Sequence, residues 1–127
     1  MMRLTGSEWS VLDCLWEESP QTVMQLVAKL RERMGWAKST TITTLRRTED
    51  KGLVHCEVVG RAKSYSPAVE QEEAEISETH SFLERVYRGS VGLMMSAMAQ
   101  RQELSSEEIS ELREILNKAE KEGRNNE

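Results

Sequence analysis

The stretch STTITTLRRTEDKGLV, residues 39–54, has the length and the ends of a helix but offers few apolar side chains to bury. Ser39 is a favourable N-cap residue and Gly52 a favourable residue for a left-handed helix end, so a helix is predicted over residues 40–51. With a turn of about 100° per residue, Ile42 and Leu45 point the same way and are expected to hold this helix on the core. The opposite side is predicted to carry Thr40, Thr43, Thr44, Arg47 and Lys51, with Arg46 on its flank.

This predicted polar side suits contact with double-stranded DNA. Short threonine side chains allow close approach to the major groove, and guanidinium groups bind phosphates or the edges of guanines. Lys38 adds a cation at the predicted helix start, where Ser39 and free backbone N–H groups can hold a phosphate. A solvated surface without a ligand is the alternative, but β-branched threonine is a poor choice for an exposed helix, so helix stability alone does not explain this composition.

The segments on either side have the element order of a winged helix-turn-helix. Capping-box sequences at residues 5–8 and 22–25 predict two earlier helices, which Pro20 and Gly35 end. After the third helix, LVHCEVV, GRA and KSYSP predict a strand, a turn and a second strand. Three helices followed by a β-hairpin are typical of that fold. The residues of the hairpin that are expected to reach backbone phosphates are Arg61 and Lys63.

Residues 69–127 are predicted to form helices without a strand. Apolar residues recur at helical spacing in three segments, separated by Arg88-Gly89-Ser90 and by a third capping box at residues 105–108. Because three short amphipathic helices rarely close a stable core alone, we expect this region to join two copies of the chain. The predicted interface residues of this homodimer are Phe82, Leu83, Val86, Leu93, Met94, Ala97, Leu112 and Leu116.

The fold class is therefore predicted to be mainly α with a small β-hairpin, namely a winged helix-turn-helix DNA-binding domain over residues 1–68 and a helical dimerisation domain over residues 69–127. The charges divide at the same place. Residues 1–68 carry 10 Lys and Arg against 8 Asp and Glu, whereas residues 69–127 carry 7 against 14. The acidic second half is expected to stay away from DNA and to leave contact to the basic first half.

Composition and motifs argue against several other classes of protein. No apolar run approaches the roughly 18 residues that span a bilayer, and the N-terminus lacks the apolar segment of a signal peptide, so we expect a cytoplasmic protein with no membrane contact. Cys14 and Cys56 lie outside any CxxC motif, and each is expected to be a free, at least partly buried thiol. No catalytic set, phosphate-binding glycine loop or metal-ligand spacing is present, so we expect neither an enzyme nor a metal or other cofactor.

Over nearly its whole length the chain resembles the penicillinase repressor family, which includes repressors of β-lactamase and methicillin-resistance genes and copper-responsive repressors. The most specific matches are LTGSEWSVLDCLWE, STTITTLRRTEDKGLV and GRAKSYSP, and LERVYRGSVGLM and LSSEEISELREIL resemble the family's C-terminal helices. The resemblance implies a dimer that binds a two-fold operator through its winged helices. It places Thr40, Thr43 and Arg47 at motif positions of the recognition helix. Thr48 departs from the motif, where an apolar residue is usual.

The resemblance also bears on how such a repressor is released from DNA. In some members a membrane-bound sensor protease, triggered by a β-lactam, leads to cleavage in the dimerisation region, at a place that corresponds to Ala97–Met98 here; these two residues do not match the cleaved pair of the staphylococcal relatives. The copper-responsive branch has a cysteine-rich C-terminal motif, which residues 69–127 lack. We therefore predict a dimeric transcriptional repressor of a palindromic operator, released when the dimer is disrupted. A winged-helix adaptor that binds proteins and not DNA is the alternative.

Overall fold

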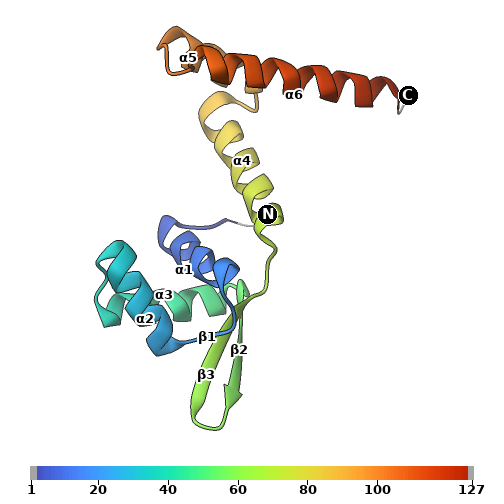
Figure 1. Ribbon diagram of the computed structural model, residues 1–127. Helices are drawn as coiled ribbons and strands as arrows, with labels where there is room; N and C mark the ends of the chain where they lie inside the picture. Colours follow the sequence, from blue (N-terminus) through green and yellow to red (C-terminus); the bar gives the residue numbers. More distant parts are fainter. Residues whose placement is uncertain (1–2, 126–127) are drawn as a thin grey trace. The chain divides into compact units, whose positions relative to one another are not determined.

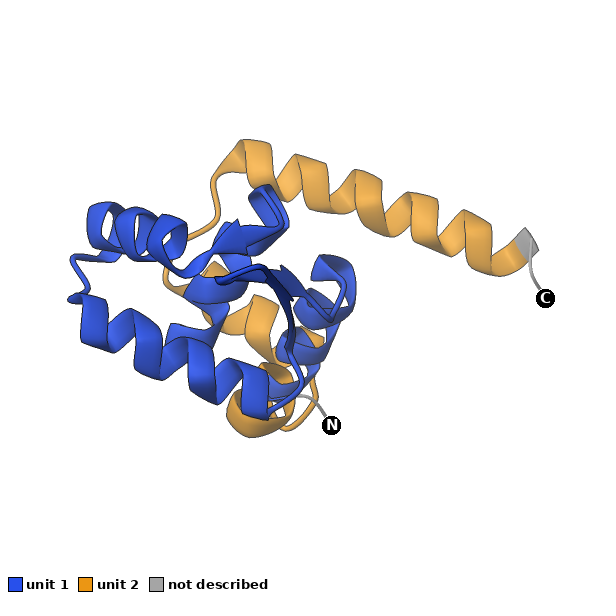
Figure 2. Ribbon diagram, turned by 90° about the horizontal axis from the view of Figure 1, so that it is seen from below, with its two compact units in different colours: residues 1–81 blue, residues 82–127 orange. Residues whose placement is uncertain are grey.

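The computed structural model describes residues 3–125, which form six helices and a three-stranded antiparallel sheet (Figure 1). The elements are, in order, α1 (Gly6–Glu17), β1 (Gln21–Thr22), α2 (Val23–Met34), α3 (Lys38–Asp50), β2 (Val54–Val59), β3 (Ala62–Pro67), α4 (Gln71–Tyr87), α5 (Val91–Gln100) and α6 (Ser106–Asn125). The predicted fold class, mainly α with a β-hairpin, is confirmed. The chain divides into two compact units, Met1–Ser81 and Phe82–Glu127 (Figure 2).

The core of the first unit lies between α1, α2, α3 and the sheet. Apolar side chains from all four parts are buried together, and their burial is the main source of stability for this unit. The fully or nearly fully buried members are Val11, Leu12, Cys14, Leu15, Leu26, Leu30, Leu45, Leu53, Val54 and Tyr65.

Helix α1 begins at its predicted N-cap, although only half of the predicted capping box forms. The side chain of Thr5 accepts a hydrogen bond from the backbone N–H of Glu8 at 3.1 Å. The carboxylate of Glu8 does not return to the N-cap backbone, because it is buried against the end of α3. At the other end of α1, the buried Gln21 side chain donates to the carbonyls of Cys14 and Glu18, and the backbone N–H of Glu18 also donates to the carbonyl of Cys14.

A tight three-residue connection joins α2 to α3. The capping box of Thr22 and Gln25 starts α2 as predicted, and Gly35, at φ +69°, ends it. The prediction that Ser39 is the N-cap of α3 is wrong: the N-cap is Ala37, which has no capping side chain, and the helix begins at Lys38. The physical reason is Trp36, which packs against the core directly after Gly35 and so fixes the start of α3 closer to α2.

The hairpin forms as predicted, with one addition. β2 pairs with β3 in antiparallel register from Val54 opposite Pro67 to Val59 opposite Ala62, and the turn lies at residues 60–61. A short strand that was not predicted, β1, pairs with the other edge of β3 and gives the order β1-β3-β2. The hairpin extends beyond the three helices of its unit (Figure 1).

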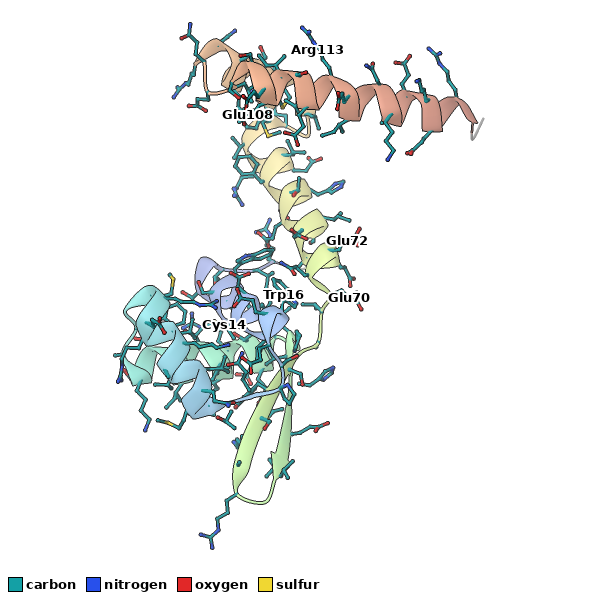
Figure 3. The ribbon with its side chains drawn as sticks, viewed as in Figure 1. Cys14, Trp16, Glu70, Glu72, Glu108 and Arg113 are labelled. Carbon is teal, nitrogen blue, oxygen red and sulfur yellow. The ribbon has the colours of Figure 1, made fainter. Side chains whose placement is uncertain are left out.

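The first unit ends inside α4 and not at residue 68. The indole N–H of Trp16, a side chain labelled in Figure 3, donates to the carbonyl of Val69 at 3.0 Å. Ala74 of α4 is completely buried. The carboxylate of Glu78 accepts from the backbone N–H of Leu4 at 2.9 Å. These contacts attach the beginning of α4 to the first unit, whereas the functional boundary at residue 68 stays a prediction.

The second unit contains the end of α4 with α5 and α6. Arg88 and Gly89 both have positive φ and break the helix where the sequence predicts a break. Ser90 caps α5, and Ser105 and Glu108 form the predicted reciprocal box before α6. The rings of Phe82 and Tyr87 meet edge to face, with centroids 5.9 Å apart.

Candidate nucleic-acid interface

The inward face of α3 consists largely of threonines. Thr41, Thr44, Leu45 and Thr48 are buried, and Ile42 is half-buried. The prediction that Thr44 belongs to the exposed face is therefore wrong. Its hydroxyl donates to the carbonyl of Thr40 at 2.8 Å, and that of Thr48 to the carbonyl of Thr44 at 2.6 Å. A threonine that bonds to its own helix in this way can be buried without a partner elsewhere, which is how Thr48 occupies a position where an apolar residue was expected.

The outward face of α3 carries the remaining predicted contact residues. All of them are exposed and they project from successive turns of one helix: Lys38, Ser39, Thr40, Thr43, Arg46 and Arg47. Because the N-cap of α3 has no side-chain acceptor, the first-turn N–H groups of this helix are not capped by a side chain of the described residues. This face thus combines small side chains, hydroxyls, guanidinium groups and helix-start N–H groups.

Lys51 differs from the other predicted contact residues. Its ammonium lies 2.7 Å from a carboxylate oxygen of Glu8, whose side chain is 0% exposed, and 3.5 Å from the backbone carbonyl of Arg3. No local sequence signal predicts this ion pair, since its partners are 43 residues apart.

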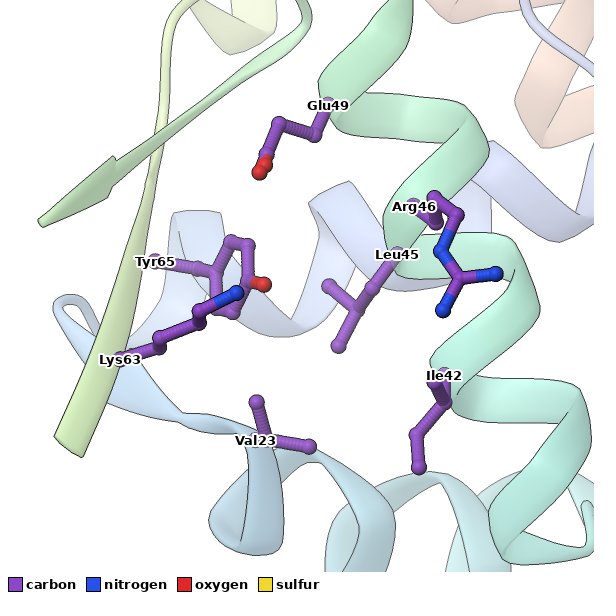
Figure 4. A pocket seen from close by; sticks show the side chains of 7 residues that line it. All are labelled: Val23, Ile42, Leu45, Arg46, Glu49, Lys63 and Tyr65. Carbon is purple, nitrogen blue, oxygen red and sulfur yellow. The ribbon is translucent and has the colours of Figure 1, made fainter. Parts of the chain in front are cut away.

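The hairpin places a second set of cations near α3. Lys63 of β3 and Arg46 of α3 line the same hollow of about 260 Å³, together with Glu49 (Figure 4). Val23, Leu45 and Tyr65 form its apolar part. Arg61 is exposed at the turn and, with Lys63, lines a further hollow beside the start of α2. Helix and hairpin therefore bring cations from distant parts of the sequence to one region of the first unit.

The cations of this region differ from several others in the first unit in that they form no ion pair. Lys29 pairs with Glu18, Arg33 with Glu17 and Lys51 with Glu8. Within residues 3–81, no ion pair involves the cations predicted to face DNA, namely Lys38, Arg46, Arg47, Arg61 and Lys63. Five of the seven Lys and Arg residues of residues 3–81 that lack an ion pair thus lie on α3 and the hairpin, which also carry Glu49, Asp50 and Glu57.

Two titratable groups near the core have shifted pKa values. Burial raises the pKa of the Cys14 thiol, although Arg33, whose guanidinium lies 3.7 Å from the sulfur, lowers it in part. Burial also raises the pKa of Tyr65 to about 12, and a hydrogen bond with the side chain of Cys56 adds to this effect. Both cysteines are free thiols, Cys14 buried and Cys56 half-buried, as predicted. A raised thiol pKa means that Cys14 is a weak nucleophile.

Residues 3–125 contain no group of three or more His, Cys, Asp or Glu side chains placed to hold a metal ion. None of the described helices is long and apolar enough to cross a membrane.

The second unit exposes most of the residues predicted to meet a second copy. Phe82, Val86, Leu93 and Leu116 are between 42% and 66% exposed. Met94, Ala97 and Leu112 are half-buried. Leu83 differs, because it is already buried within one chain and has little surface left for a partner.

Comparison with known proteins identifies the family. The family model described as penicillinase repressor matches residues 4–118. The chain belongs to the penicillinase repressor family. It is 29% identical over 114 residues to the penicillinase repressor of Bacillus licheniformis, covering 90% of this chain and 89% of that one. It is 24% identical over 115 residues to the methicillin resistance regulatory protein MecI of Staphylococcus aureus, covering 91% and 94%.

Solved structures of this penicillinase repressor family share the fold of the first unit. The DNA-binding domain of the repressor BlaI matches with a TM-score of 0.52 at 22% identity, over 56% of this chain and 87% of that one. The monomeric form of Bacillus licheniformis BlaI, solved in complex with the blaP half-operator, matches with a TM-score of 0.51, over 57% and 88%. The predicted winged-helix fold is confirmed, and membership of a repressor family confirms that the chain is a repressor and not an enzyme.

Proposed function

We propose that this protein is a transcriptional repressor that binds a palindromic operator as a homodimer, with α3 of each copy in the major groove. The observation that carries the proposal is the concentration of unpaired, exposed cations on α3 and the hairpin of the first unit. A helix in the major groove needs small side chains for close approach and guanidinium groups for guanine edges or phosphates. The BlaI structure with its half-operator supports DNA as the partner, because BlaI shares the fold of this unit.

Each element of the first unit has a distinct role in this proposal. Thr40 and Thr43 approach base edges, while Arg47 binds a guanine edge or a phosphate. Lys38 and Ser39, with the uncapped N–H groups of α3, bind a backbone phosphate. Arg46 and Lys63 line one hollow from its two sides, so they are proposed to hold a phosphate between helix and hairpin (Figure 4). Arg61 extends this contact along the backbone.

The second unit is proposed to form the interface with a second copy of the chain. Three of its helices expose apolar side chains, among them Leu93 at 54% and Leu116 at 66%, which a partner would remove from water. Two linked DNA-binding units gain affinity through effective concentration, so a dimer binds a two-fold site far more tightly than either unit alone. Release then follows from disruption of the dimer. A repressor of this type acts where the chromosome is, in the cytoplasm.

Whether a sensor protease takes part is a separate proposal. The bond Ala97–Met98 lies inside α5, and both side chains are half-buried. A protease needs an extended segment, so cleavage there would require α5 to unwind locally. Loss of α6 by such cleavage would remove part of the proposed dimer surface.

The proposal is tested by measuring operator affinity at several salt concentrations by fluorescence anisotropy. A binding-selection experiment with the full chain first supplies the operator. Arg47→Ala is expected to weaken binding, because each copy of the dimer loses one contact; for a phosphate contact, the slope of log affinity against log salt falls by about 2, one for each copy. Arg61→Ala with Lys63→Ala removes two phosphate contacts from each copy and is expected to lower that slope by about 4.

Arg33→Gln is the matched control, because Arg33 is a cation of the same unit that already pairs with Glu17. It is expected to leave both affinity and salt slope unchanged. If Arg47→Ala bound the selected DNA like the unmodified protein, α3 would not be the reading element, and a protein-binding role for this face would be favoured.

A further inference from the structure

Lys51 lies at the end of the proposed DNA-binding helix, but its side chain pairs with a carboxylate of α1. Its ammonium is 2.7 Å from Oε1 of Glu8, and the same oxygen accepts from the hydroxyl of Thr5 at 3.0 Å. The carboxylate is 0% exposed, and Oε2 has no hydrogen-bond partner among the described residues. An ionised carboxylate out of water is costly unless a cation compensates it, and Lys51 provides that cation.

The ion pair lies at the C-terminal end of α3, where the helix ends and the chain turns toward β2. Lys51 is the C-cap residue, and its backbone N–H donates to the carbonyl of Arg47 at 3.1 Å. Gly52, at φ +75°, then turns the chain, and the backbone N–H of the buried Leu53 donates to the carbonyl of Thr48. A cation at this end also complements the partial negative charge of a helix C-terminus.

Helix α3 needs such an attachment because its inward face is poor in apolar groups. Leu45 is the only large aliphatic residue among the four that are buried on α3. The other three are threonines, which contribute less burial energy than leucine or isoleucine at the same positions. The Glu8–Lys51 pair therefore adds to the weak apolar attachment of α3 to α1.

We propose that Lys51 is a positioning residue for DNA binding and not a phosphate contact. Its ammonium pairs with the buried carboxylate of Glu8, while the lysine side chain itself is 40% exposed. This pair fixes the C-terminal end of α3 on α1 and thereby sets how Arg47, one turn earlier, is presented to DNA. The segment at Arg3 strengthens this attachment through its carbonyl. This inference rests on the proposed function of α3, but the ion pair itself can be measured without DNA.

The experiment compares Lys51→Met, Glu8→Gln, the double variant and Arg47→Ala in the full chain. Thermal unfolding is followed by circular dichroism, and affinity for the selected operator is measured at several salt concentrations. Lys51→Met leaves the buried carboxylate unpaired and is expected to lower Tm by at least about 5 °C. Affinity should fall by the same factor at every salt concentration, so the salt slope stays unchanged.

The double variant has no unpaired buried charge and is expected to recover Tm. Because it also lacks the ion pair that positions α3, its affinity should stay below that of the unmodified protein, with an unchanged slope. Glu8→Gln is not expected to rescue the affinity of Arg47→Ala, because that variant lacks the DNA contact itself. The operator affinity of Glu8→Gln changes in opposite directions for the two possible roles of Lys51. A positioning role predicts weaker binding at an unchanged slope, whereas a phosphate contact predicts tighter binding with a steeper slope, since the ammonium is set free.

Three results would overturn the inference: a double variant no more stable than Lys51→Met, a slope lowered by about 2 in either variant that lacks Lys51, or tighter binding by Glu8→Gln. If Lys51→Met does not fold, the double variant decides through its slope. Absence of DNA binding by the unmodified protein would instead reject the proposed function, and recovery of Tm in the double variant would still show that Glu8 and Lys51 act as a pair.

Discussion

At the scale of single residues, threonine chemistry decides how α3 is held. Thr41, Thr44 and Thr48 recur at helical spacing with Leu45, so the inward face was visible in the sequence as a periodic pattern. Of these three threonines, only Thr44 is predicted from the sequence to face outward, because threonine is polar. Burial is possible because the hydroxyls of Thr44 and Thr48 donate to carbonyls one turn earlier. The sequence pattern does not predict these hydrogen bonds.

Thr41 is the exception and gives a prediction. Its hydroxyl is buried but has no hydrogen-bond partner among the described residues. Thr41→Val removes this unpaired group and keeps the shape, so it is expected to raise the free energy of unfolding by about 1 kcal/mol. Thr48→Val is the matched control, because its hydroxyl is bonded, and should gain less. Urea denaturation followed by circular dichroism measures both, and a loss of stability in Thr41→Val would contradict the assignment.

Tyr65 predicts a dependence of stability on alkaline pH. Its pKa is raised to about 12 by burial and by Cys56, from an ordinary value of about 10, so the folded state holds the phenol proton more tightly than the unfolded state. The resulting stabilisation is complete below about pH 10 and is lost as pH rises through about 12, and it amounts to at most about 3 kcal/mol. Burial shifts the pKa of Cys14 in the same direction, so its thiol adds to the alkaline loss.

The check is the free energy of unfolding of Tyr65→Phe between pH 9 and 12, at about one-unit steps. This variant lacks the phenol and should lose less stability over that range than the unmodified protein. Tyr87→Phe is the control, since that ring lies in the second unit and touches Phe82. Parallel curves for Tyr65→Phe and the unmodified protein would show that Tyr65 does not cause the loss.

At the scale of elements, the sequence predicts the helix ends and turns that depend on neighbouring residues. The capping residues of α2 and α6, the glycine end of α2 and the hairpin turn all lie where the sequence places them. The misses depend on contacts between distant residues. β1 exists because it pairs with β3, with Gln21 opposite Tyr65, and α3 begins early because Trp36 reaches the core.

The attachment of the beginning of α4 also depends on residues that are far apart in the sequence, since Trp16 and Val69 are 53 residues apart. It can be tested. Trp16→Phe keeps an aromatic ring but loses the indole N–H that donates to Val69. We expect the free energy of unfolding to fall by about 1 kcal/mol and amide hydrogen exchange to become faster over residues 69–78. Trp36→Phe, which changes a half-buried tryptophan against the core, should leave exchange in that segment unchanged. Equal exchange in both variants would mean that Trp16 does not hold the beginning of α4.

At the scale of the whole molecule, the two units differ in what they leave exposed. The first exposes unpaired cations on α3 and the hairpin, and the second exposes apolar side chains on an acidic background. The charge division along the chain predicted this difference, because net charge is a property of composition. One of the predicted interface residues differs from its neighbours: Leu83 belongs to the same apolar pattern as Phe82 and Val86, but it is buried inside one chain.

This separation predicts that dimerisation and DNA contact can be impaired independently. Leu116→Asp places a charge on an apolar side chain that is 66% exposed in one chain, so it should convert the dimer to a monomer without unfolding it. Light scattering after size-exclusion chromatography measures the mass. Affinity for the palindromic operator should fall by about 100-fold or more, because the gain from linking two units is lost, while affinity for a half-site stays the same.

Val59→Asp is the control for oligomeric state, since it makes the same kind of change at a side chain 71% exposed on β2, outside the proposed interface. It should remain a dimer. Arg47→Ala should give the opposite pattern to Leu116→Asp, with a normal mass and weaker binding to both the half-site and the full operator. If Leu116→Asp were monomeric but still bound the palindrome as tightly as the unmodified protein, release by disruption of the dimer would be ruled out, because a single winged helix would then suffice for operator affinity.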